Sequence, residues 1–141
     1  MKIEELNPDE VLASLLDGKV EVQTSETEKH PITCYADNKT PGTDLGDEFL
    51  SVMLNGPVGT VAEVRFKGNI ALTIFCRLLE DGTAKTRRIR SIIGQCRMKA
   101  MSRSVNGFLF RMDPKQVITP TTPNLMTGYS TTVINVEWRT I

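Results

Sequence analysis

Residues 66–96 read FKGNIALTIFCRLLEDGTAKTRRIRSIIGQC, and this stretch decides the fold class. The run Ile70–Leu79 is apolar at nearly every position, which predicts a central strand buried on both faces of a sheet. Asp81-Gly82 then turns the chain. From Thr83 to Arg103 the apolar residues recur instead at helical spacing, at Ile89, Ile92, Ile93, Cys96 and Ala100. This stretch therefore predicts a central strand followed by a long amphipathic helix that packs on the sheet.

Upstream of this stretch the pattern predicts a hairpin partner for the central strand. Val61–Phe66 has the composition of a strand, and Lys67-Gly68-Asn69 has that of a tight turn. Before it, Asp47–Leu54 fits a short helix as well as a strand. In either case Gly56-Pro57 is expected to end that segment.

The N-terminal region begins with the signals of a short helix. Asn7 is expected to cap it, Pro8 suits its first turn and Gly18 is a natural stop. Two strands joined by a polar turn at Ser25–Lys29 are expected to follow, and their ranges are Lys19–Thr24 and Ile32–Ala36.

The C-terminal region predicts two more strands, at Phe108–Met112 and Tyr129–Arg139. Loops near 37–46 and 119–128 are rich in Pro, Thr, Asn and Gly, so we expect them to be exposed and to reach a neighbouring molecule. Residues 1–141 are expected to form a single domain. The predicted class is α+β, a mainly antiparallel sheet with an N-terminal helix and one long amphipathic helix packed on it.

Charge is divided unevenly along the chain. Residues 1–63 hold 13 acidic and 4 basic side chains, whereas residues 64–141 hold 13 basic and 4 acidic ones, so the net charge of zero is −9 followed by +9. Complementary patches of this kind can steer association between copies and set its register. Alternatively, the two halves interleave in the fold and neutralise each other within one molecule.

The long helix carries most of its basic residues on the side opposite its apolar face. Arg87, Arg90 and Arg97 are the chief members, and no acidic residue lies between Asp81 and Asp113. We therefore expect these three arginines to form a subunit interface with acidic residues of an adjacent copy or partner. A solvated helix face is the alternative.

The sequence gives little sign of catalysis. His30, the single histidine, lies in a polar segment without a nucleophile at a recognised spacing, and no phosphate-binding loop is present. The three cysteines fit neither a disulfide framework nor a zinc site, and we expect them to be buried hydrophobic residues. We predict no enzyme activity, no cofactor, no metal and no membrane span, and we expect the chain to be made in a reducing cytoplasm.

Three segments together resemble the tail-terminator family of long-tailed phages. They are NPDEVLASLLDG at 7–18, the stretch at 66–96 quoted above, and TTPNLMTGYSTTVINVEWRTI at 121–141. The likeness rests on pattern, and it also fits other head–tail connector and tail-completion proteins.

The resemblance implies a non-enzymatic virion protein of the tail or neck. Such a protein forms a ring, usually a hexamer, that caps the tail tube, joins it to the head connector and makes transient contact with passing DNA. The alternative is an accessory protein that binds nucleic acid through the basic helix at 85–103, in which case its affinity would fall steeply with salt.

Overall fold

A computed structural model describes residues 6–36, 46–62, 65–101, 104–112 and 128–141 of the chain. Two helices and eight strands are present in these residues, and the predicted α+β class is confirmed. In chain order the elements are α1 (Pro8–Leu16), β1 (Glu21–Gln23), β2 (Lys29–Pro31), β3 (Thr33–Tyr35), β4 (Glu48–Ala62), β5 (Arg65–Arg77), α2 (Thr86–Ala100), β6 (Ser104–Val105), β7 (Phe108–Met112) and β8 (Tyr129–Thr140).

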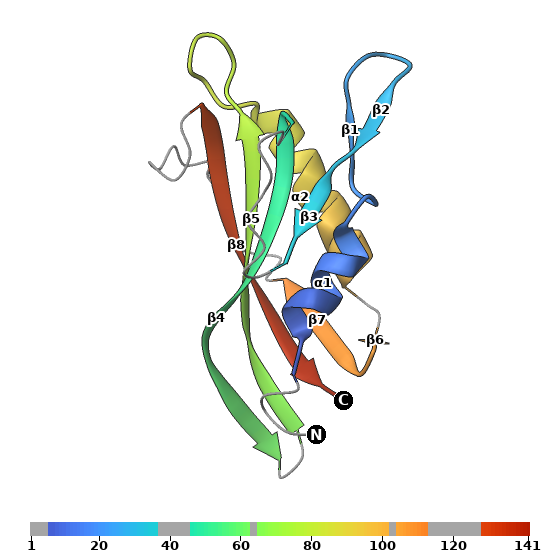
Figure 1. Cartoon of the computed structure of the whole chain (residues 1–141), viewed down its shortest axis with the longest axis vertical. Coiled ribbons are helices and arrows are strands. Elements are labelled where there is room, and N and C mark those ends of the chain that lie inside the picture. Colours follow the sequence, from blue (N-terminus) through green and yellow to red (C-terminus); the bar gives the residue numbers. More distant parts are fainter. Residues whose placement is uncertain (1–5, 37–45, 63–64, 102–103, 113–127) are drawn as a thin grey trace.

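The main sheet has six strands in the order β3-β4-β5-β8-β7-β6. All neighbours are antiparallel except β3 and β4, which are parallel. The central position predicted for Ile70–Leu79 is confirmed, because β5 pairs with β4 on one side and β8 on the other. Strands β1 and β2 form a separate hairpin. Figure 1 shows this hairpin at one end of the long axis and the far ends of β4 and β5 at the other.

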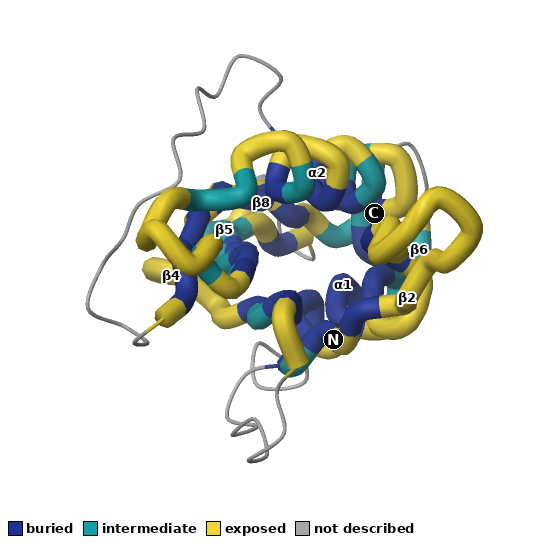
Figure 2. The backbone as a smooth tube through the Cα atoms, turned by 90° about the horizontal axis from the view of Figure 1, so that it is seen from above, coloured by how far each residue is buried: buried dark blue, intermediate teal, exposed yellow. Residues whose placement is uncertain are grey.

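The core lies on one face of the main sheet. Alternate residues of β4, β5, β7 and β8 join the inward residues of both helices in one buried cluster, so α1 and α2 cover the same face. Figure 2 shows the buried backbone inside and the exposed outer side of α2. Burial of β5 on both faces was predicted and is wrong, since Ala71, Thr73 and Phe75 on the opposite face are only half-buried. We call this second side, which neither helix covers, the open face.

The hairpin between β4 and β5 is longer than predicted, and its turn lies elsewhere. Strand β4 resolves the helix-or-strand alternative at 47–54 as a strand and continues through Gly56-Pro57, where the register shifts between Asn55 and Gly59. A bulge absorbs these residues, and Pro57 lies where β4 has no partner on its other edge, so the strand does not end there. Lys67-Gly68-Asn69 is part of β5, paired with β8, and forms no turn.

Other boundaries agree more closely with the sequence. Helix α1 begins at Pro8 and the chain leaves it through Gly18, at a φ of 70°, as predicted, but the Asn7 side chain makes no capping hydrogen bond. Strands β7 and β8 lie where they were predicted. Helix α2 is shorter than the predicted Thr83–Arg103. Of the two predicted loops, only Gly46 and Gly128 fall within the described residues.

Gly68 is required by its neighbour on β8. It pairs directly with the buried Trp138, and a Cβ atom added to Gly68 would lie 2.7 Å from Cζ2 of the indole ring. The ring is enclosed by the core and cannot retreat without disturbing it. The tight-turn signal at this glycine therefore reflects a close approach of two strands.

We expect Gly68→Ala to lower the free energy of unfolding by about 1–3 kcal/mol, because it overpacks the Trp138 site. Gly94→Ala is the matched control, since a Cβ there meets nothing within 4 Å and alanine favours a helix by roughly 1 kcal/mol. Urea denaturation followed by Trp138 fluorescence measures both variants. Equal stability of Gly68→Ala and the wild type would show that the indole is not confined.

Candidate functional site

The loop before α2 is built by a short polar turn. Gly82 has a φ of 84°, and its N–H donates to the carbonyl of Leu79 at 2.9 Å. The Asp81 carboxylate accepts hydrogen bonds from the backbone N–H and the hydroxyl of Thr83, at 2.9 and 2.6 Å. These hydrogen bonds lower the pKa of Asp81 below its usual value. The turn sets the direction in which α2 leaves the sheet.

One flank of α2 is neutralised within the molecule. Arg88 lies 2.5 Å and Lys85 lies 3.9 Å from the Glu48 carboxylate of β4, whose side chain is only 6% exposed. Lys85 and Arg88 therefore have an acidic partner within the molecule, although no acidic residue lies between Asp81 and Asp113 in the sequence. Glu48 belongs to the acidic half of the sequence and its partners to the basic half, so the two halves do interleave here.

The same flank holds the β1–β2 hairpin in place. The Gln95 side chain donates to the carbonyl and accepts from the N–H of Glu21, both at 2.8 Å. Arg88 also donates to the carbonyl of Gln23 at 3.0 Å. Side chains of α2 thus satisfy backbone groups of β1 that would otherwise face the helix unpaired.

The three arginines predicted to form an interface are not part of this neutralised flank of α2. Arg87 and Arg90 are exposed and Arg97 is half-buried. None of them lies within 4.0 Å of an acidic side chain among the described residues, and Nε of Arg97 is buried without a hydrogen-bond partner. We call Arg87, Arg90 and Arg97 the outer basic surface. Its middle is open, because a Cβ added at Gly94 would touch nothing.

The positive charges of this surface do not stabilise α2. The N-terminal end of a helix carries a partial positive charge and favours acidic side chains. The first turn of α2 contains no acidic residue and places Arg87 next to Arg88. Only Glu48 offsets this positive charge among the described residues, and it does so on the inner flank. The outer basic surface is therefore suited to an anionic group outside the molecule.

The potentially reactive side chains are placed where they are chemically inert. Cys34, Cys76 and Cys96 are free and buried, as predicted. Burial raises the pKa of Cys76 to about 11 and that of Cys96 to about 12, and it raises the pKa of Cys34 further. His30 is exposed on β2. The described residues contain no group of three or more potential metal ligands.

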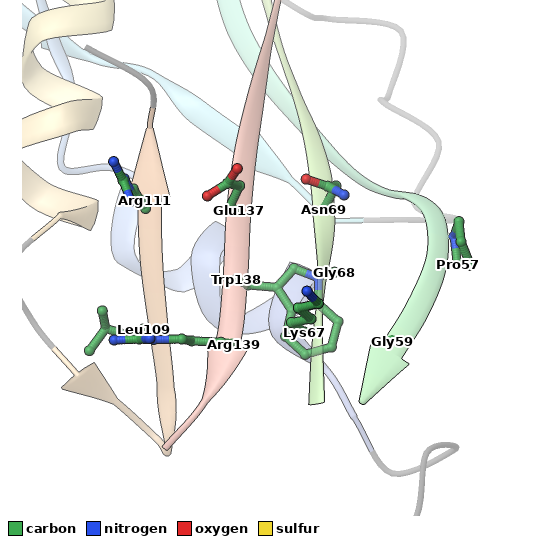
Figure 3. Close-up of a pocket in the computed structure, with 10 residues that line it drawn as sticks. All are labelled: Pro57, Gly59, Lys67, Gly68, Asn69, Leu109, Arg111, Glu137, Trp138 and Arg139. Atoms are coloured by element: carbon green, nitrogen blue, oxygen red, sulfur yellow. The ribbon is translucent and has the colours of Figure 1, made fainter. Parts of the chain in front are cut away.

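A second charged surface lies on the open face and was missed in the sequence. A groove of about 530 Å3 crosses the ends of β4, β5, β7 and β8 that lie away from the β1–β2 hairpin. Its charged residues are Lys67, Arg111, Glu137 and Arg139, and Figure 3 shows Glu137 between Arg111 and Asn69 in one row, with Arg139 and Lys67 in the next. We call it the open-face groove. The alternation of β8 indicates that Glu137 and Arg139 share a face, but only the strand pairing brings Lys67 and Arg111 beside them.

Comparison with known proteins adds no assignment to these surfaces. No protein-family model matches the chain, and no curated protein matches it. None of the helices in the described residues is both long and apolar enough to cross a membrane.

Proposed function

We propose that this chain is a non-enzymatic structural protein of a phage virion, which forms a ring that terminates the tail tube and joins it to the head connector. The observation that carries the proposal is the sorting of charge on α2. Lys85 and Arg88 are neutralised by Glu48, whereas the outer basic surface has no acidic partner among the described residues. A helix whose inner charges are paired and whose outer charges are free is suited to contact another molecule.

The described fold supports a role in assembly over one in chemistry. Its three thiols are buried and its histidine is exposed on the separate β1–β2 hairpin, so among the described residues no hydrogen bond joins the histidine to a thiol. A ring needs a heterologous interface, in which two different patches of one subunit meet on its neighbours. The outer basic surface supplies one patch, and its partner is an acidic patch of an adjacent copy or of a stacked virion protein.

The charge of the outer basic surface also fits the alternative function, in which the protein binds nucleic acid through its basic helix. Arg87 and Arg90 are exposed on a basic helix, as phosphate contacts require. Such binding would weaken steeply as salt is raised and would not depend on oligomeric state. Measuring association of the protein with itself and with a DNA duplex in the same salt series separates the two functions.

We expect the triple variant Arg87→Glu, Arg90→Glu, Arg97→Glu to remain a folded monomer that no longer assembles. Each exposed pair contributes only about 0–1 kcal/mol, but several reversed together turn attraction into repulsion. Size-exclusion chromatography with light scattering, with and without isolated tail tubes, measures the mass of the assembly. Circular dichroism verifies the fold, and the double variant Arg87→Glu, Arg90→Glu spares the half-buried Arg97.

Lys19→Glu, Lys99→Glu is the matched control for the double variant, because both lysines are exposed and the change in charge is the same. We expect this control to assemble normally. Normal assembly of the triple variant would show that the outer basic surface is an ordinary solvated helix face.

A further inference from the structure

The open-face groove has unpaired charges at one end of the molecule. Among the described residues, Lys67, Arg111, Glu137 and Arg139 make no ion pair within 4.0 Å. All four are exposed. Their side chains stand on the open face, away from the core cluster, so the core does not require these charges. The groove thus presents three cations around one carboxylate.

The β1–β2 hairpin has the opposite charge and lies at the opposite end of the long axis (Figure 1). Glu26 and Glu28 at its turn are exposed and make no ion pair with the described residues. All three residues of β2, Lys29–Pro31, are exposed as well. The end of this hairpin therefore projects from the molecule, and its exposed side chains are not part of the core.

Hydrogen bonds hold the turn of the hairpin in one shape. The hydroxyl oxygen of Ser25 accepts from the N–H groups of Thr27 and Glu28, at 3.3 and 3.1 Å, and the N–H of Thr24 donates to the carbonyl of Glu28 at 3.0 Å. The two carboxylates are thus presented on an ordered turn. An ordered turn loses less conformational entropy on docking than a flexible segment does.

We propose that the open-face groove of one copy receives the β1–β2 turn of a second copy, with Glu26 and Glu28 near Lys67, Arg111 and Arg139, and with Lys29 near Glu137. Because the two surfaces lie at opposite ends of the molecule, they meet only between copies, head to tail (Figure 1). This inference rests on the proposed self-assembly, for which it supplies a second contact beside the outer basic surface.

The composition of the groove favours a protein segment over a nucleic acid. Glu137 stands among the cations and would repel a phosphate backbone, whereas Lys29 of the hairpin offers it a partner. Leu109 adds apolar lining, which suits the stems of side chains. Gly59, beside Lys67, contributes no side chain, so a backbone turn can approach β4 closely.

A charge-swap experiment on the full chain tests this docking. The groove variant is Lys67→Glu, Arg139→Glu and the hairpin variant is Glu26→Lys, Glu28→Lys. Each variant alone has like charges on both surfaces, and we expect its self-association to weaken at least about tenfold. In an equimolar mixture every groove again meets a hairpin of opposite charge, so we expect association to return. Sedimentation velocity in low salt measures all three samples, and circular dichroism verifies folding.

The equimolar mixture of the two variants provides the decisive test of the proposed docking. Absence of association in the mixture of two folded variants would overturn the docking, as would normal association of either variant alone. Loss of duplex DNA binding by the groove variant, with self-association unchanged, would also overturn it and would assign the groove to nucleic acid. If the Arg87, Arg90, Arg97 variant stops assembling while the swap variants assemble normally, the proposed ring stands and this docking falls.

Discussion

Ile92→Asp should abolish folding of the protein. Ile92 is fully buried on α2, within the cluster that joins both helices to the sheet. The substitution removes apolar burial and places a carboxylate where the neighbouring side chains are apolar, which costs about 4–5 kcal/mol or more. Small domains are stable by only about 5–15 kcal/mol, so a loss of this size removes nearly all the stability of a domain at the lower end of that range.

Ser91→Asp provides the control for this variant. Ser91 is the adjacent residue on α2 but is exposed, so an acidic side chain at this position remains in water. We expect Ser91→Asp to be soluble with the wild-type melting temperature, whereas Ile92→Asp is insoluble or melts far lower. A soluble Ile92→Asp protein with a normal circular dichroism spectrum would show that this side of α2 is not core.

Removing the carboxylate of Glu48 should have the second-largest effect. Glu48→Gln removes the counter-charge of Arg88 and Lys85. The side chain at position 48 is almost fully buried, and Arg88 and Lys85 are partly buried themselves. Truncating one partner of a buried ion pair typically costs about 3–5 kcal/mol, and the partial exposure of Arg88 and Lys85 reduces this to roughly 2–4 kcal/mol. Urea denaturation measures the loss as a lower transition midpoint.

The matched control is Asp47→Asn, which changes the residue immediately before β4. Asp47 pairs with Arg77 at 2.8 Å, but the two side chains are 60% and 51% exposed. We expect a loss of at most about 1 kcal/mol, since an exposed pair contributes little. Equal losses for the two variants would mean that burial does not strengthen the Glu48 cluster.

Elements whose signal is local could be predicted from the sequence. The helical spacing of Ile89, Ile92, Ile93, Cys96 and Ala100 identified the residues of α2 that the structure buries. The alternation of β8 identified Ile134, Val136 and Trp138 as its buried face. In each case the periodicity of one element reports which side meets a core, and no knowledge of its neighbours is needed.

Features that depend on pairing could not be predicted in the same way. Gly68 has the composition of a turn, and only its register with Trp138 reveals that the glycine makes room for an indole ring. Glu48 and Arg88 are 40 residues apart, so their pairing follows from the packing of α2 near β4. The open-face groove likewise collects residues from four strands. Such contacts are set by tertiary geometry, which composition and spacing do not encode.

The charge division is explained in part by these contacts. All three ion pairs in the described residues join Asp47 or Glu48 of the acidic half to a basic residue of the other half. Pairing between the two halves of the sequence within one molecule therefore explains the charges of Lys85, Arg88 and Arg77. It leaves the outer basic surface, the open-face groove and the hairpin carboxylates without ion-pair partners among the described residues, and we propose that these charges serve in assembly.

Immunogold electron microscopy of particles produced by the genome that encodes this chain tests the central proposal most directly. An antibody against the purified full chain should label intact particles at the junction of head and tail, and the chain should be present in the purified particles in a few copies each. Particles of normal composition that lack the chain, or label confined to unassembled material, would contradict a role as a tail-terminating ring.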